Sequence, residues 1–306
     1  MKTAFVLSGG ASLGAIQVGM LKALYEREIA PDLIVGTSVG AINAAFVASR
    51  QQTSATADAL ADVWLALRRS EVFPLNPVTG FVGFFGGRNH LIPDRHLRRL
   101  VAKHLEIERL EDARVPLHVI ATDVLSGEEV RLSRGDALEA VMASTAIPGV
   151  FPPVEWGERD LVDGGISNDA PISHALELGA ERVYVLPTGY ACALEEPPRG
   201  ALAMLLHSTS LLVQRRLLVE IELLGDGAEL VVLPPPCPLA VQPIDFGRAA
   251  ELIEAAYADA REFLTGAQSA DGTSIPIMRL RPHGHGGRRN GPGRRRAQPP
   301  RQPTSP

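Results

Sequence analysis

Residues 32–47 decide the fold, and they read DLIVGTSVGAINAAFV. Residues 32–35, of which 33–35 are apolar, predict a short buried strand, and residues 41–47, which are rich in small residues, predict a helix packed on a sheet. Between them lies Gly36-Thr37-Ser38-Val39-Gly40, a G-x-S-x-G sequence at a strand-to-helix turn. This context predicts a nucleophile elbow, with the Ser38 hydroxyl exposed at the N-terminus of the following helix.

The two glycines of this motif support the same interpretation. Gly36 and Gly40 leave room for neighbouring backbone where a Cβ atom would clash. The alternative is a chance match, since the chain contains 29 glycines. The strand before the motif and the helix after it favour the elbow.

Composition indicates a globular protein. Of the 306 residues, 45% are hydrophobic and 21% are charged, which is ordinary for such proteins. No apolar run of about 18 residues predicts a transmembrane span. A strand begins at residue 3, which leaves no room for a signal peptide, so we expect a cytoplasmic protein. Cys192 and Cys237 have no metal-ligand pattern around them and are expected to be free thiols in a reducing compartment.

Charge divides the chain into two parts. We expect one folded domain over residues 1–270 and a disordered tail over 271–306, because residues 282–306 are rich in Gly, Pro and Arg and almost lack apolar residues. No acidic residue follows Asp271, whereas arginine stands at positions 288, 289, 294, 295, 296 and 301. The expected role is a solvated extension, and the alternative is an electrostatic tether to anionic lipid or nucleic acid.

Strand and helix patterns alternate along the folded part. This order predicts a three-layer α/β/α fold with a mostly parallel central sheet. The expected strands are 3–8, 33–35, 117–121, 129–132, 161–162, 182–186 and 229–233. The expected helices are 14–28, 41–47, 55–67, 137–144, 201–224 and 252–264.

One segment fits neither pattern. Residues 80–87 contain three Phe and four Gly within the irregular stretch 74–93. One interpretation is a loop whose aromatic rings pack into the core. The other is a mobile flap that offers apolar side chains to an acyl chain or to a bilayer interface.

A serine nucleophile needs a base, and Asp163 is the best candidate. None of the eight histidines is flanked by a turn pattern typical of a catalytic loop. Asp163 ends an apolar pair directly before Gly164-Gly165, a strand end at which a carboxylate could reach the serine. Partial burial would raise its pKa and suit it as a general base. The alternative is a simple Asp-Gly turn.

The oxyanion site is expected in residues 8–14, SGGASLG, which follow the first strand and open a helix. Backbone N–H groups at such a turn can hold a developing negative charge. Dinucleotide binding is the competing interpretation, but its G-x-G-x-x-G pattern is absent and it gives the serine elbow no role.

Four sequence blocks together resemble the patatin-like phospholipases, bacterial members in particular. They are residues 9–14, 36–40, 163–165 and 143–153, the last being similar to the family stretch A-S-x-A-x-P-x-x-F-P. The resemblance extends over about residues 3–190. It implies a Ser38–Asp163 dyad without histidine and an oxyanion hole at Gly9, Gly10 and Ala11. The motif glycines are Gly14, Gly36, Gly40, Gly164 and Gly165.

Two positions depart from the family pattern. The family usually has Gly at the position of Ala11 and Arg or Lys at the position of Leu13. An alanine constrains the turn if φ is positive there. Loss of the cation removes a positive charge from beside the oxyanion loop, so we expect weaker activity or a different acyl substrate.

The resemblance implies a serine lipid acylhydrolase of the phospholipase A or lysophospholipase type, in a patatin-like acylhydrolase domain. We expect no metal or other cofactor, no nucleic acid partner, and a lipid or acyl-ester substrate met in peripheral contact with a membrane. The alternatives are an esterase or thioesterase for soluble acyl substrates and a weakly active lipid-binding regulator. Head group, chain length and oligomeric state stay open, and a standard α/β-hydrolase is disfavoured because its serine normally follows several strands, whereas only two expected strands precede Ser38.

Overall fold

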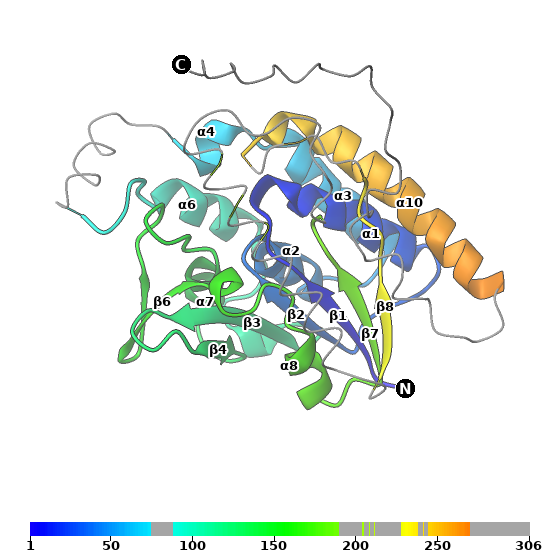
Figure 1. Cartoon of the computed structure of the whole chain (residues 1–306), viewed down its shortest axis with the longest axis horizontal. Helices are drawn as coiled ribbons and strands as arrows, with labels where there is room; N and C mark the ends of the chain where they lie inside the picture. Colours follow the sequence, from blue (N-terminus) through cyan, green and yellow to red (C-terminus); the bar gives the residue numbers. More distant parts are fainter. Residues whose placement is uncertain are drawn as a thin grey trace, which may run out of the picture.

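The computed structural model describes residues 1–74, 88–189, 228–237, 241 and 244–269, together with residues 204, 208 and 211. Within these residues a single sheet of 8 strands forms the centre of the molecule (Figure 1). Its strand order is β5-β6-β3-β2-β1-β7-β8, and β4 pairs with β3 beside this path.

The sheet has a parallel centre and an antiparallel edge. The strands β3, β2, β1, β7 and β8 pair in parallel, and they span Leu117–Asp123, Leu33–Thr37, Thr3–Leu7, Arg182–Leu186 and Glu229–Val232. At the edge, β4, β5 and β6 pair antiparallel, and they span Glu129–Leu132, Val154–Trp156 and Arg159–Asp163. The parallel strands are rich in Val, Ile and Leu because both faces of this part are covered.

Helices pack on both faces of the sheet (Figure 1). One face carries α1, α2, α3 and α7, which span Ala15–Tyr25, Val39–Ala48, Ser54–Ala66 and Ala137–Ser144. The long helix α10, Ala249–Ser269, packs along α1. The opposite face carries α8, Ile172–Glu177. The remaining helices are α4 and α6, Arg69–Val72 and Arg95–His104, and the 3-10 turns Ala11–Gly14, Leu110–Asp112, Gly164–Ile166 and Phe246–Arg248.

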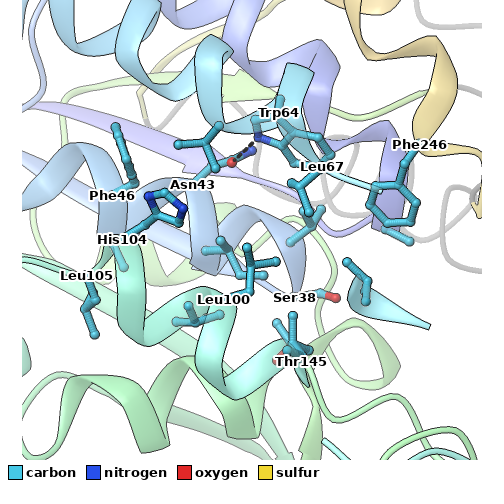
Figure 2. A pocket seen from close by; sticks show the side chains of 18 of the residues that line it. Ser38, Asn43, Phe46, Trp64, Leu67, Leu100, His104, Leu105, Thr145 and Phe246 are labelled. Carbon is cyan, nitrogen blue, oxygen red and sulfur yellow. Dashed lines mark hydrogen bonds between the residues drawn. The ribbon is translucent and has the colours of Figure 1, made fainter. Parts of the chain in front are cut away.

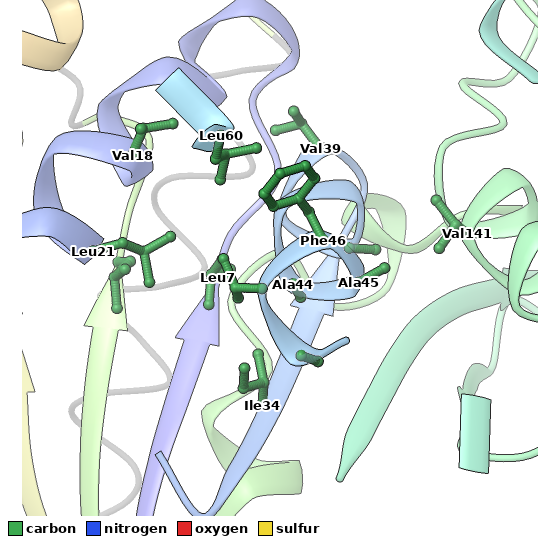
Figure 3. Close-up of a cluster of buried hydrophobic side chains, with 14 of the residues drawn as sticks. Leu7, Val18, Leu21, Ile34, Val39, Ala44, Ala45, Phe46, Leu60 and Val141 are labelled. Carbon is green, nitrogen blue, oxygen red and sulfur yellow. The ribbon is translucent and has the colours of Figure 1, made fainter. Parts of the chain in front are cut away.

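The core follows from the alternation of side chains along the strands. In β1, Phe5 and Leu7 belong to the large cluster under α1 and α2, whereas Ala4 and Val6 belong to the smaller cluster under α8. Figure 3 shows the larger cluster, in which side chains of α1, α2 and α3 meet above β1 and β2. This packing fixes the end of β2, from which the elbow projects.

The predicted α/β class with a mostly parallel sheet is confirmed. The Phe-rich segment 80–87, almost all of the predicted helix 201–224 and the tail 271–306 lie outside the described residues, so the domain boundary at 270 stays a prediction. In the described part, no helix combines the length and the apolar character that crossing a bilayer requires.

The prediction of two free thiols is wrong. Cys237 is disulfide-bonded, and Cys192, the other cysteine of the chain, lies outside the described residues. The spacing of the two cysteines in the sequence did not indicate this bond. The thiols therefore no longer support a reducing compartment.

Candidate active site

Ser38 sits in a strained turn between β2 and α2. Its backbone angles are φ 54° and ψ −125°, an uncommon conformation for a non-glycine residue. A Cβ at Gly36 would lie 2.7 Å from the Gly40 carbonyl oxygen, and a Cβ at Gly40 would overlap the carbonyl oxygen of Leu7. Both glycines are therefore needed for the close packing of the turn, as the elbow interpretation requires.

Asp163 reaches Ser38 from β6, which is separated from β2 by β3 in the sheet. Ser38 Oγ donates a hydrogen bond of 2.6 Å to Asp163 Oδ2, and both residues are buried. Strand β6 runs antiparallel to β3, with Asp163 opposite Ala121. The Asp163 carboxylate thus lies at the end of an antiparallel strand. The sequence did not predict this direction, because an apolar pattern of only two residues, 161–162, does not indicate strand orientation.

The surroundings of Asp163 shift the pKa of its carboxyl group. Burial raises the pKa of the Asp163 carboxyl to about 6, and hydrogen bonds from Ser38 Oγ–H and Gly165 N–H oppose this effect. The Gly165 N–H donates to Oδ1 at 2.8 Å, and the Thr122 hydroxyl donates to the Asp163 carbonyl oxygen at 2.9 Å. Both carboxylate oxygens are therefore held, one by the loop and one by Ser38.

The raised pKa predicts an acid limb in the pH profile of activity. Asp163 accepts a proton only when it is ionised, so kcat/KM for a short soluble ester should rise as pH increases through about 6. Initial rates measured from pH 4.5 to pH 8 test this. A profile that is flat across pH 6 would exclude Asp163 as the titrating base.

The same shift predicts an effect on stability. Since the folded-state pKa is above the unfolded value of 3.8, the native state binds more protons between pH 4 and 6, and stability falls as pH rises through that window. The difference corresponds to about 3 kcal/mol at most. Asp163→Asn should therefore raise the free energy of unfolding at pH 7.5 more than at pH 4, as urea denaturation would measure. Equal effects at both pH values would contradict the raised pKa.

The predicted oxyanion loop lies directly beside Ser38. A Cβ at Gly9 would lie 3.2 Å from Ser38 Cβ, so glycine permits this approach. The Gly9 N–H is already engaged, since it donates to Asp169 Oδ1 at 3.1 Å and to the Asp169 carbonyl oxygen at 3.3 Å. Within the part of the chain that the structure describes, the N–H groups of Gly10 and Ala11 have no acceptor.

The two departures from the family pattern have different structural outcomes. Ala11 has φ 52°, so the alanine does occupy a left-handed conformation, which costs about 1 kcal/mol relative to glycine. Leu13 is 6% exposed and belongs to the large core cluster. The expectation that position 13 presents its side chain beside the oxyanion loop is therefore not supported for this leucine, because its apolar side chain is more stable in the core.

Sequence reasoning missed the role of Ser144, the last residue of α7. Its hydroxyl donates to the Ile120 carbonyl oxygen and accepts a hydrogen bond of 2.8 Å from the Ser38 N–H. Ser144 is fully buried, and among the described residues its hydroxyl is the acceptor that satisfies the Ser38 N–H group. Ser144 lies in the sequence block 143–153, which resembles the family stretch. Its place in this block was the only feature of the sequence that could have indicated a role at the site.

Replacing Ser144 with alanine should lower kcat more than it raises KM. The Ser38 N–H would lose its partner in a strained turn, and an unmade buried hydrogen bond costs about 1–3 kcal/mol, or roughly 5- to 160-fold in kcat. Steady-state kinetics on a short ester measure this. Ser49→Ala is the control, since its buried hydroxyl donates to the Phe46 carbonyl oxygen away from the dyad. Equal kinetics of the two variants would contradict the positioning role.

Histidine takes no part in the dyad as the structure describes it. Over residues 1–74 and 88–189, no histidine is hydrogen-bonded to Ser38 or Asp163. His174 pairs with Glu129, with a distance of 2.9 Å between His174 Nε2 and Glu129 Oε2. His207, His283 and His285 lie outside the described residues.

An apolar pocket opens at Ser38. It encloses about 830 Å³ of space not occupied by protein atoms, its open mouth included, and it extends between α2, α3 and α6 (Figure 2). Its lining includes Leu60, Val63 and Trp64 from α3 and Leu67, which directly follows this helix. The sequence places these four on one helical stripe, which resembles an ordinary core face, so their role in the pocket could not be recognised before the helices were packed.

A buried polar network connects this pocket with the oxyanion loop. Trp64 Nε1 donates to Asn43 Oδ1 at 3.0 Å (Figure 2). Asn43 Nδ2 donates to the Gly14 carbonyl oxygen at 3.0 Å and to Gln17 Oε1 at 2.9 Å. Gln17 Nε2 in turn donates to the Ser8 carbonyl oxygen at 2.8 Å. One set of amides thus holds both the pocket wall and the loop beside the nucleophile.

The fold and the site define a class of protein. A sheet that is mostly parallel carries a serine elbow paired with a buried carboxylate, and the sequence model of the family described as patatin-like phospholipase matches residues 5–176. This chain belongs to the patatin-like phospholipase family. The resemblance inferred from the four sequence blocks is thereby confirmed.

Curated relatives include mammalian and bacterial proteins. Patatin-like phospholipase domain-containing protein 7 from Mus musculus is 29% identical over 195 residues, which cover 61% of this chain and 13% of that protein. Patatin-like phospholipase domain-containing protein 6 from Homo sapiens is 28% identical over 189 residues, with the same shares. An uncharacterized NTE family protein from Mycobacterium tuberculosis is 29% identical over 252 residues, covering 75% of this chain and 40% of that protein. The chain spans less than half of each of these relatives.

Two solved structures are also similar. VipD from Legionella pneumophila superposes with a TM-score of 0.44 at 15% sequence identity, over 87% of this chain and 67% of that chain. ExoU in its complex with SpcU from Pseudomonas aeruginosa gives a TM-score of 0.38 at 18% identity, over 88% and 52%.

Proposed function

We propose that the protein is a serine acylhydrolase that acts on lipid esters. The observation that carries this proposal is the 2.6 Å hydrogen bond from Ser38 Oγ to Asp163 Oδ2 at the mouth of an apolar pocket. Nucleophile and base are within reach of each other, and the base has a pKa of about 6, suited to proton transfer near neutral pH. Membership of the patatin-like phospholipases supports the same chemistry.

In the proposed mechanism Asp163 accepts the Ser38 proton as Ser38 Oγ attacks the ester carbonyl. The N–H groups of Gly10 and Ala11, which have no acceptor among the described residues, stabilise the tetrahedral oxyanion, and Gly9 allows the loop to lie close to the nucleophile. Asp163 then returns the proton to the leaving alcohol. In the second half-reaction Asp163 activates water, which hydrolyses the acyl-enzyme and releases the fatty acid.

The pocket supports an acyl chain as the group transferred to Ser38. Its lining is almost entirely aliphatic and aromatic, so a hydrocarbon chain gains from burial there, by about 0.8 kcal/mol per methylene. A polar acyl group would lose its hydration without a partner. The pocket therefore favours fatty acyl esters over small polar esters.

Labelling of the serine tests this proposal. A fluorophosphonate probe should modify Ser38, with the adduct located by peptide mass spectrometry, and Ser38→Ala should remain unlabelled. Hydrolysis of a panel of phospholipids, lysophospholipids and soluble thioesters then separates the lipid substrate from the soluble alternatives. Absence of labelling at Ser38 would favour the lipid-binding regulator.

Peripheral membrane contact is a further part of the proposal. Six arginines at positions 288–301 would attract anionic lipid, each by on the order of 1 kcal/mol near the surface. Co-sedimentation of the full chain with anionic and with neutral vesicles at low and high salt tests this. Equal binding to both kinds of vesicle would contradict an electrostatic role for the tail.

A further inference from the structure

The pocket has the form of a slot with Ser38 at one end. The lining residues of α2 recur every three or four positions and so share one face of that helix. They are Ser38, Val39, Ile42, Asn43, Ala45 and Phe46. Helix α6 contributes a matching stripe, Leu97, Leu100, Val101 and His104. The slot therefore runs along α2, between α3 and α6.

The length of this slot follows from helix geometry. Phe46 lies eight positions after Ser38 along α2, which corresponds to about 12 Å at 1.5 Å per residue. With C–C bonds of about 1.52 Å at about 111°, an extended hydrocarbon chain advances about 1.25 Å per carbon. The distance from Ser38 to Phe46 thus accommodates about ten acyl carbons.

Phe46 and His104 line the slot at the end away from Ser38 (Figure 2). Arg50 holds both in place. Its guanidinium carbon lies 3.7 Å from the centre of the Phe46 ring, and its Nη1 donates to the Phe46 carbonyl oxygen at 2.8 Å. Its Nη2 donates to the His104 carbonyl oxygen at 3.0 Å and pairs with Glu106 at 2.8 Å.

These contacts tie the C-terminal end of α2 to the C-terminal end of α6. A guanidinium that stacks on a ring and donates to two carbonyl groups has little freedom to move, and Arg50 is mostly buried. Displacing Phe46 or the end of α6 would break several of these interactions at once. The far end of the slot is therefore a fixed wall, unlike its open mouth.

The imidazole of His104 is compatible with an apolar neighbour. Burial lowers the pKa of His104 below 6.5, and the positive charges of Lys103 and Arg50 lower it further. The ring is neutral at pH 7, so a methyl group can lie against it without displacing a charge.

We propose that Phe46 and His104, held by Arg50, form the end wall of the acyl pocket and make this enzyme selective for acyl chains of about ten carbons. The proposal rests on the proposed function, because it assigns the acyl chain of the Ser38 ester to this slot. It adds a substrate class, medium-chain acyl esters, and the residues that set the limit.

A series of p-nitrophenyl esters from C2 to C16 tests the proposed wall. Within the slot, kcat/KM should rise by about three- to fourfold per added methylene, the equivalent of about 0.8 kcal/mol. The rise should end near C10, and longer chains should give lower values. A rise that continues to C16 in the unmodified protein would overturn the proposal while leaving ester hydrolysis itself established.

Two substitutions should move the optimum in opposite directions. Phe46→Ala opens the wall and should shift the optimum to chains longer by about four carbons, and His104→Trp fills the end and should shift it to C8 or shorter. Lys103→Trp is the matched control, because Lys103 is an exposed neighbour on α6 outside the pocket, and it should keep the optimum at C10. An optimum that stays at C10 in both wall variants would overturn the proposal. Thermal melts show which variants are folded. If only one of the two wall variants folds, its chain-length optimum is sufficient to test the proposal.

Binding separates this proposal from the proposed function. Trp64 lines the slot, and in a Trp156→Phe background it is the one remaining tryptophan of the chain. Changes in Trp64 fluorescence should report the binding of saturated fatty acids. We expect the affinity to rise with chain length up to C10 and then to stop rising. If no ester is hydrolysed but this limit is found, the hydrolase proposal fails and the wall stands. If the affinity continues to rise with chain length from C10 to C16, the proposed end wall is excluded.

Discussion

Replacing Ser38 with alanine, or Asp163 with asparagine, is expected to lower kcat for ester hydrolysis by at least about 10⁴-fold. Alanine removes the nucleophile. Asparagine keeps the shape of Asp163 but cannot accept the proton, so the Ser38 hydroxyl is no longer activated. The hydrogen bond of 2.6 Å between the two side chains is the basis of this expectation.

The double variant should be hardly slower than either single variant, because a nucleophile and its base act as a unit. Active-site titration and single-turnover kinetics on a short ester measure all three proteins. Circular dichroism serves as the control for folding, and Asp112→Asn, an exposed carboxylate on a 3-10 turn, controls for the loss of a negative charge. If Asp163→Asn kept most of its activity, another base would have to serve, and the dyad assignment would be wrong.

The second large effect is expected from Gly40→Ala. The added Cβ would overlap the carbonyl oxygens of Leu7 and Ser8, which belong to β1 and to the start of the oxyanion loop. Backbone atoms cannot move aside as a flexible side chain can, so we expect a loss of about 3 kcal/mol or more in the free energy of unfolding. Hydrolysis should be lost as well, since the turn that carries Ser38 must shift. Urea denaturation and ester kinetics measure the two effects.

Gly266→Ala provides the matched control. Gly266 lies in α10, and an added Cβ there meets nothing within 4 Å. The same substitution in an open helical position should stabilise the protein by about 0.5–1 kcal/mol. If Gly40→Ala were as stable as Gly266→Ala, the close packing of the elbow against β1 would be excluded.

The parts of the fold that could be predicted are those with a local cause. Helix α7 and strand β7 were predicted with their observed bounds, because Asp136 accepts a hydrogen bond from the Glu139 N–H at the start of α7 and an uninterrupted apolar run forms β7. Ser38 and Asp163 were recognised for the same reason, since each lies beside glycines that mark its turn.

The parts that could not be predicted depend on distant packing. The direction of β6 is set by pairing with β3, and the partner of the Ser38 N–H comes from Ser144, more than a hundred positions later. Likewise, the Gly9 N–H donates a hydrogen bond to Asp169, which lies 160 positions later in the sequence. The apolar side chains of α3 show the same helical spacing in the sequence whether they pack against the core or line a pocket.

The amide network from Trp64 through Asn43 and Gln17 to Ser8 has a consequence for how such a protein can diversify. A substitution near Trp64 alters the pocket wall and also disturbs the hydrogen bonds that support the oxyanion loop. At this position the shape of the pocket therefore cannot change independently of the loop. The wall at Phe46 and His104 lies outside these hydrogen bonds. On the proposed function, substitutions at that end can therefore change the preferred acyl length while the hydrogen bonds that support the oxyanion loop stay in place.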